Sequence, residues 1–148
     1  MNVEKVIKTT KEIPIESRTL IHIELVNNMI SETLACVLKP FEMSIQQFNV
    51  LRILRGQKGQ PANLSTLNER MVTKMSNTTR LVDKLLLKDY VSRTVCPSNR
   101  RKIEIRITCK GEEILKEMDN AIKNAENKLV AQLSAEELQL LNHLLDKF

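Results

Sequence analysis

A short polar segment near the middle of the chain carries side chains that can hydrogen-bond to the edges of DNA bases. It contains Ser76, Asn77, Thr79 and Arg80. An Asn can pair bidentately with adenine and an Arg with guanine, and Ser or Thr hydroxyls can serve bases or phosphates. Phosphates also need nearby cations, and the same stretch supplies Lys74, Lys84 and Lys88. A DNA-reading helix requires these residue types, although an exposed polar helix face would have the same composition.

A second group of cations follows in the expected tip of a β-hairpin. Residues 91–95 and 103–107 alternate apolar and polar side chains, which is the pattern of half-buried strands. The residues between them, CPSNRRK, are turn formers followed by three consecutive cations. We therefore predict a seven-residue tip over Cys96–Lys102 that carries the residues able to reach a phosphate backbone or a minor groove: Asn99, Arg100, Arg101 and Lys102.

Positive charge is concentrated in this part of the chain. The formal net charge is +5, but residues 70–110 contain eleven Lys and Arg against three acids, a net of +8, whereas residues 111–148 carry −4. A focused basic stretch is the electrostatic footprint of a surface that binds a polyanion, and scattered lysines would be ordinary solubilising charge.

The segments before, between and after these two groups of residues have apolar side chains at helical spacing. A polar arm over 1–16 precedes the helices, which are expected over about 17–39, 44–56, 64–71, 74–88, 108–133 and 134–145. Their expected N-caps are Ser17, Ser44, Thr73, Thr108 and Ser134, and residues 60–63 lead into the short helix at 64–71. Only 3% of residues are aromatic, so Leu, Ile, Val and Met must build the core. The predicted fold class is mainly α with one small β-hairpin.

The order of these elements is that of a winged helix-turn-helix. A helix, a short helix, a longer helix and a two-stranded hairpin follow one another between residues 44 and 107. In this arrangement the third helix enters the major groove and the hairpin, or wing, reaches the backbone or the minor groove.

Three segments of the chain resemble the MarR family of bacterial transcription factors. They are SIQQFNVL at 44–51, RLVDKL at 80–85, and the wing followed by ITCKG at 107–111. The resemblance covers most of the chain and implies a winged helix-turn-helix flanked by N- and C-terminal dimerisation helices. It also implies that Arg101 is the wing arginine and that Ser76–Arg80 is the turn of the recognition helix that faces the groove.

The sequence departs from the family pattern at two positions. Asn99 stands in the wing where the family usually has Asp, which leaves open how charge is paired inside the wing. Asp89 follows the recognition helix where the family usually has Gly. Because Asp tolerates the left-handed backbone conformation better than most residues, the helix is still expected to end there.

The resemblance implies a homodimer that binds a palindromic operator in double-stranded DNA. We expect a single domain over 1–148, with dimerisation helices at 17–39 and 108–148 and a DNA-binding region at 44–107. Two recognition helices one DNA turn apart read a palindrome, whereas one short helix reads too few bases. Alternatively, the apolar stripes cover one another within a monomer. The expected dimer contacts are Leu20, Ile23, Leu129, Leu138, Leu141 and Leu145.

Other chemistry is sparse in the sequence. Cys36, Cys96 and Cys109 lack the CxxC spacing of a zinc site, and we expect them to be ordinary residues, with oxidant sensing as the alternative. His22 and His143 are isolated, so no metal, cofactor or catalytic pair is expected. The N-terminus shows no signal peptide and no apolar run is long enough for a membrane span, which predicts a cytoplasmic protein.

The leading hypothesis is a DNA-binding transcription regulator. The resemblance implies a repressor that releases DNA when a small molecule, often a phenol, enters a cleft between the dimerisation and DNA-binding regions. A winged-helix module that binds protein rather than DNA is the alternative, and the +8 segment speaks against it. An enzyme is least expected, because no nucleophile–base pair or glycine-rich loop with paired carboxylates is present.

Overall fold

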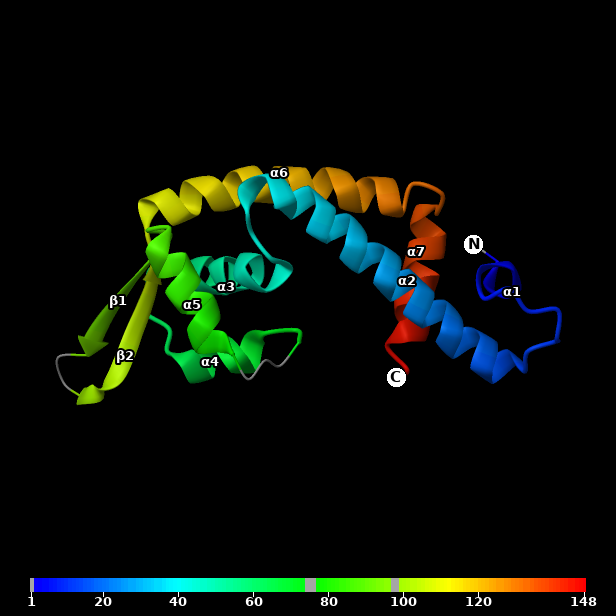
Figure 1. Cartoon of the computed structure of the whole chain (residues 1–148), viewed down its shortest axis with the longest axis horizontal. Coiled ribbons are helices and arrows are strands. Elements are labelled where there is room, and N and C mark those ends of the chain that lie inside the picture. The colour runs from blue at the N-terminus through cyan, green and yellow to red at the C-terminus, as the bar shows by residue number, and fades with distance from the viewer. Residues whose placement is uncertain (1, 74–76, 97–98) are drawn as a thin grey trace.

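The computed structural model describes residues 2–73, 77–96 and 99–148, and for Cys96 and residues 99–102 it describes the backbone alone. Within these residues the chain is mainly helical with one two-stranded hairpin, as predicted (Figure 1). The elements are α1 (Val3–Val6), α2 (Ile15–Leu38), the 3-10 helix η1 (Lys39–Phe41), α3 (Ile45–Gly56), α4 (Leu64–Arg70), α5 (Thr78–Leu87), β1 (Val91–Cys96), β2 (Asn99–Ile107), α6 (Cys109–Leu129) and α7 (Ala135–Leu145).

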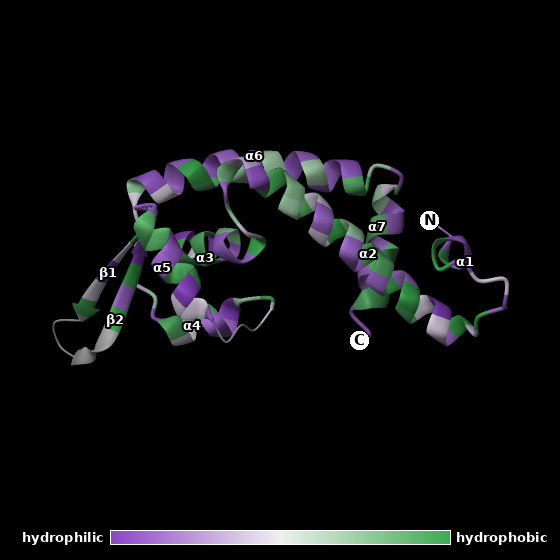
Figure 2. Ribbon diagram, viewed as in Figure 1, coloured by the Kyte–Doolittle hydropathy of each residue, from purple (hydrophilic) through white to green (hydrophobic). Residues whose placement is uncertain are grey.

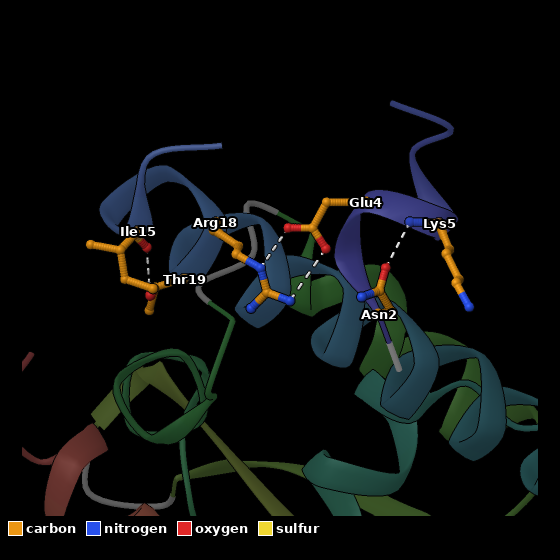
Figure 3. Close-up of polar contacts among 6 residues, drawn as sticks. All are labelled: Asn2, Glu4, Lys5, Ile15, Arg18 and Thr19. Carbon is orange, nitrogen blue, oxygen red and sulfur yellow. Dashed lines mark hydrogen bonds and ion pairs between the residues drawn. The ribbon is translucent and has the colours of Figure 1, made fainter. Parts of the chain in front are cut away.

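The N-terminal arm contains the short helix α1 and folds back onto α2. Arg18 on α2 donates from Nε to Oε1 of Glu4 at 2.6 Å and from Nη2 to Oε2 at 3.3 Å (Figure 3). The side-chain hydrogen bond from Arg18 lowers the pKa of the Glu4 carboxyl below its usual range. Val3 is fully buried, so an apolar contact and an ion pair together hold the arm.

The long helix α2 begins earlier than predicted. Pro14 is its N-cap, with φ at −50°, and the Pro14 carbonyl accepts the Arg18 N–H at 2.9 Å. Because the proline ring fixes φ and has no N–H to satisfy, it suits the start of a helix. The expected cap at Ser17 is therefore wrong, and Ser17 lies inside the first turn. The helix ends at Leu38, and Pro40 lies in η1.

Local capping signals place the next two helices where the sequence predicts them. Ser44 accepts from the Gln47 N–H at 3.2 Å, and the Gln47 side chain accepts from the Ser44 N–H at 2.9 Å. This capping box starts α3. Asn63 accepts from the Thr66 N–H at 2.9 Å and starts α4. Both helices bring apolar residues into the main core, among them Leu51 and Leu67.

Helix α5 begins at Thr78, with Asn77 as its N-cap, so the expected cap at Thr73 is wrong. The Thr78 hydroxyl is buried and donates to Oδ1 of Asn68 on α4. This bond ties the first residue of α5 to α4, and a cap pattern along the chain cannot predict it. Asp89 ends this segment with φ at +59°, as expected for a residue that tolerates the left-handed region.

The wing, formed by β1 and β2, has longer strands than the sequence indicates. Cys96 pairs with Asn99, so only residues 97–98 separate the strands, and the predicted seven-residue tip is wrong. A register shift between Val95 and Cys96 accompanies this extension. Backbone pairing skips residues 100–102 and resumes at Cys96 and Asn99, two residues that sequence reasoning placed in the turn. A third backbone segment joins β2, because Ala62 and Ile105 exchange N–H···O bonds of 2.9 and 2.8 Å.

Helices α6 and α7 begin at the predicted caps. Thr108 accepts from the Gly111 N–H at 3.0 Å, and Ser134 with Glu137 forms a second capping box. Helix α6 packs on α3 and contributes Leu115, Met118 and Ile122 to the core. Figure 1 shows the wing and α3–α5 at one end of the molecule, with α6 running from them toward α7 and the N-terminal half of α2 at the other end.

Candidate nucleic-acid interface

One face of α5 is directed to solvent and carries polar side chains. Thr79, Arg80 and Lys84 are exposed there, as the sequence predicts for a DNA-reading helix. The opposite face is buried through Thr78, Leu81, Val82 and Leu85. These apolar residues fix the rotation of α5, so the polar stripe points away from the core.

Asn77 is placed differently from its neighbours. It is half-buried at the N-cap, and its Oδ1 atom is buried without a hydrogen-bond partner. Bidentate pairing with adenine needs both the oxygen and the nitrogen of the amide at the base edge. In this conformation Asn77 cannot offer both. Lys74 and Ser76, the other predicted contacts at this end of α5, lie outside the described residues.

An ion pair joins α5 to the wing. Nη1 of Arg93 on β1 lies 3.4 Å from Oδ1 of Asp83 on α5. Both residues are exposed, and Asp83 lies on the same side of α5 as Arg80 and Lys84. The sequence identified Arg93 only as part of the basic stretch. The alternation of β1 puts Arg93 on the strand face that carries Val91, but it does not identify Asp83 on α5 as the partner.

The predicted wing cations all fall within β2. Asn99, Arg100, Arg101 and Lys102 form its first four residues, beginning opposite Cys96. Asn99 pairs with Cys96, whereas Arg100, Arg101 and Lys102 lie at the register shift between the pairs Cys96–Asn99 and Val95–Ile103 and have no partner residue on β1. The other end of β2 is tied down by Arg106, which bonds to the Gly59 carbonyl and lies 3.6 Å from Glu104.

A tight junction connects the wing to α6. The Thr108 hydroxyl donates to the Asp89 carbonyl at 2.7 Å, and the Thr108 N–H donates to the Tyr90 carbonyl at 3.1 Å. A Cβ atom at Gly111 would lie 2.1 Å from the Tyr90 oxygen. Sequence reasoning identified Gly111 as part of a helix start but not this close approach, which requires glycine.

Apolar side chains remain exposed on α2 and α7. Among the predicted dimer contacts, Leu20, Ile23, Leu141 and Leu145 are exposed, and Leu129 and Leu138 are half-buried. Helix α7 buries none of its residues, although Figure 2 shows hydrophobic segments along its ribbon. Further exposed apolar residues, outside the predicted dimer contacts, are Ile15, Met29 and Ile30 on α2, Leu140 and Leu144 on α7, and Phe148 beyond the end of α7.

A cavity of about 220 Å³ lies between α2, α3 and α6. Its lining includes Ser31 of α2, Phe48 and Arg52 of α3, and Glu126 of α6. The Arg52 guanidinium carbon lies 5.6 Å from the centre of the Phe48 ring. Val72, in the segment that precedes α5, also lines this cavity. The cavity thus combines an aromatic face with a cation and an acid.

The remaining sequence candidates for chemistry lie apart. Cys36 and Cys109 are exposed free thiols, and the Cys96 side chain is outside the description. Among the described residues, no group of three or more His, Cys, Asp or Glu side chains is placed to hold a metal ion. The same residues include no helix with the length and apolar character that crossing a membrane requires.

Comparison with known proteins gives a consistent picture. The model of the MarR family matches residues 43–103, which run from the start of α3 into β2. A MarR-like transcription regulator from Bacillus cereus is 25% identical and has a TM-score of 0.80, with 90% of this chain and 96% of that chain covered. A MarR transcription factor from Planctomyces limnophilus is also 25% identical, with a TM-score of 0.73 and coverage of 93% and 100%.

One similar structure includes nucleic acid. It is a mutant MarR from E. coli complexed with operator DNA, 25% identical, with a TM-score of 0.75 and coverage of 84% of this chain and 89% of that chain. These matches confirm the predicted winged helix-turn-helix fold, and they extend over the helices on both sides of it.

Proposed function

We propose that the chain is a member of the MarR family, whose model matches residues 43–103, and that it is a homodimeric transcription regulator that binds double-stranded DNA through α5 and the wing. The observation that carries the proposal is the exposed polar face of α5 next to the wing, in a fold shared with an operator-bound MarR. A buried apolar face orients this polar stripe, so α5 presents it as a rigid unit.

Base selection is proposed for the exposed side chains in the first turn of α5. Arg80 has the reach and geometry for a bidentate contact with guanine, and the Thr79 hydroxyl can serve a base or a phosphate. Ser76 keeps its predicted role beside them. Asn77 would contribute to readout only after its side chain turned outward. We therefore assign it a secondary part, since its Oδ1 is buried in this conformation.

Affinity is proposed to come mainly from contacts with phosphates. Lys74 and Lys84 flank the base-reading turn, and Arg100, Arg101 and Lys102 approach the backbone or the minor groove from the wing, with Asn99 at the start of the strand. Each neutralised phosphate adds about 0.9 to the slope of log K against log salt for duplex DNA. The positive net charge of residues 70–110 supports the proposed contacts with phosphates.

A second copy of the chain is the proposed partner of the exposed apolar surface. Leu20, Ile23, Leu141 and Leu145 would lie against the same elements of the other subunit, together with Leu129 and Leu138. Contiguous exposed apolar surface often marks a protein–protein interface. Two subunits would place two α5 helices on successive major-groove faces, about 34–36 Å apart, and would bind a palindromic operator.

We further propose that the chain acts as a repressor in the cytoplasm and releases DNA in response to a small molecule. The cavity between α2, α3 and α6 is the proposed site, because it lies between the two functional regions and is also lined by Val72, just before α5. Phe48 and Arg52 favour an aromatic molecule that carries negative charge. An occupant there would touch both the dimerisation helices and the segment leading to α5.

Selection of random duplex DNA by the purified chain tests the proposal. We expect an enriched palindrome with half-sites one helical turn apart, and we expect Arg80→Ala to change one position of each half-site. Failure to enrich any sequence would contradict the proposal. A reporter gene whose promoter contains the selected operator distinguishes a repressor from an activator. Loss of a repressor raises transcription of the reporter, and loss of an activator lowers it.

A further inference from the structure

The seam between α3 and α6 is closed by an ion pair at the end nearer the wing. Arg55 on α3 bonds through Nη1 to Oδ2 of Asp119 on α6, although the two residues are 64 positions apart. Beneath the pair, Leu54 of α3 and Leu115 and Met118 of α6 are buried in the same core. Among ion pairs between described residues, this one alone joins α3 to α6.

The other end of the seam is open. Arg52 lies nearly one turn from Arg55, yet it stacks on Phe48 of its own helix and forms no ion pair with a described acid on α6. The cavity of about 220 Å³ lies here, with Ile122 and Glu126 as its α6 lining. Residues 119, 122 and 126 recur at helical spacing, so the closed and open ends belong to one face of α6.

From this arrangement we infer that Arg55 and Asp119 are positioning residues for DNA binding: their ion pair is the pivot that sets the angle of the α3–wing unit on α6. The inference rests on the proposed function, because the angle matters for DNA only if two subunits present their α5 helices together. It adds the device that holds those helices at operator spacing.

The packing explains why a contact on α3 would control the position of α5. Helix α3 contacts α5, α4 and β2, so these elements move with it as one body. The core contacts of Met118 with α3 are apolar and therefore non-directional. A directional ion pair restricts rotation. As an exposed pair it contributes little to stability, so its loss should change geometry more than folding.

A distance measurement in the dimer without DNA tests the pivot. A nitroxide is attached at Leu87→Cys, an exposed position on α5, in a background with Cys36→Ser, Cys96→Ser and Cys109→Ser. We expect one narrow inter-subunit distance in this parent. The distribution of this distance should broaden or shift in the Arg55→Ala variant and in the isosteric Asp119→Asn variant. The double variant R55D with D119R, which exchanges the two charges, should restore the narrow distribution. Arg18→Ala is the matched control, since it removes an ion pair of similar exposure that lies within the N-terminal region.

Binding to the selected operator gives the second readout. Each single variant should bind about three- to tenfold more weakly and discriminate less against operators with one base pair added between half-sites, and the charge exchange should reverse both effects. Unchanged distances in both single variants would overturn the inference and leave the proposed function intact. If the parent shows no inter-subunit distance, the dimer is absent and the proposed function fails together with the inference.

Discussion

Asp83 on α5 and Arg93 on β1 form an ion pair of 3.4 Å that ties the proposed recognition helix to the wing. The pair lies beside Arg80 and Lys84 on the exposed side of the helix. Because the two DNA-contacting elements come from different parts of the chain, a fixed angle between them is needed for simultaneous contacts with one duplex. The Asp83 carboxylate also lowers the net positive charge of this face. It therefore orients the wing relative to α5 but weakens the attraction of this face for phosphates.

Replacing Arg93 with Ala should weaken DNA binding without unfolding the protein. The pair is exposed, so the free energy of unfolding should change by no more than about 1 kcal/mol. Affinity for the selected operator should fall about fivefold, because the wing loses its fixed angle to α5. Fluorescence anisotropy and urea unfolding measure the two effects. Arg93→Lys keeps the charge and serves as the control, and an Arg93→Ala protein with full affinity would show that the tie is dispensable.

Gly111→Ala should destabilise the junction between the wing and α6. The added Cβ would lie 2.1 Å from the Tyr90 carbonyl oxygen, so backbone must move, at a cost of about 1–3 kcal/mol in unfolding free energy. Gly56→Ala is the matched control, since no atom lies within 4 Å of its added Cβ. Urea denaturation compares the two, and equal stability of both variants would contradict the geometry of the junction.

Arg80→Ala and Asn77→Ala should affect base preference differently. Arg80 is exposed in the first turn of α5, so its loss should relax selection at one position of each half-site, by about 1–3 kcal/mol of discrimination. Asn77 should have a smaller effect, because its Oδ1 is buried. Sequencing of DNA selected by each variant measures both. A profile altered by Asn77→Ala and unaltered by Arg80→Ala would reverse this assignment.

The N-terminal arm should loosen only in acid. The Arg18 side chain lowers the pKa of Glu4, so the folded arm holds a carboxylate that the unfolded arm protonates at higher pH. The stabilisation is present above the usual Glu range and is lost as pH falls through the lowered pKa. The Nε–H resonance of Arg18 in NMR spectra should report this loss. Glu4→Gln should show a loosened arm at neutral pH, and an identical acid transition in that variant would exclude Glu4 as its cause.

Sequence reasoning succeeded where structure is determined over a few neighbouring residues. The capping boxes at Ser44 and Ser134 were predicted because donor and acceptor lie three positions apart. The alternation of the wing strands and the left-handed backbone at Asp89 are local in the same sense. The buried and exposed faces of α5 followed from helical periodicity, and with them the exposure of Arg80 and Lys84.

It failed where a contact from elsewhere in the fold determines the outcome. The first residue of α5 is tied to α4 by the bond between Thr78 and Asn68, two residues on different helices. The wing strands lengthen because backbone pairing opposite Cys96 overrides turn propensity. Neither the Asp83–Arg93 tie nor the Arg55–Asp119 pair can be found from spacing alone, since their partners meet only in the folded chain.

The salt dependence of operator binding tests most directly whether α5 and the wing cations bind duplex DNA. Fluorescence anisotropy of the selected duplex at several salt concentrations gives the slope of log K against log salt. We predict a steep negative slope for the unmodified chain, and for Arg101→Ala weaker binding to all sequences with a slope smaller in magnitude by about 0.9, one phosphate contact. A flat response of the unmodified chain would contradict the account and would favour a winged-helix module that binds protein.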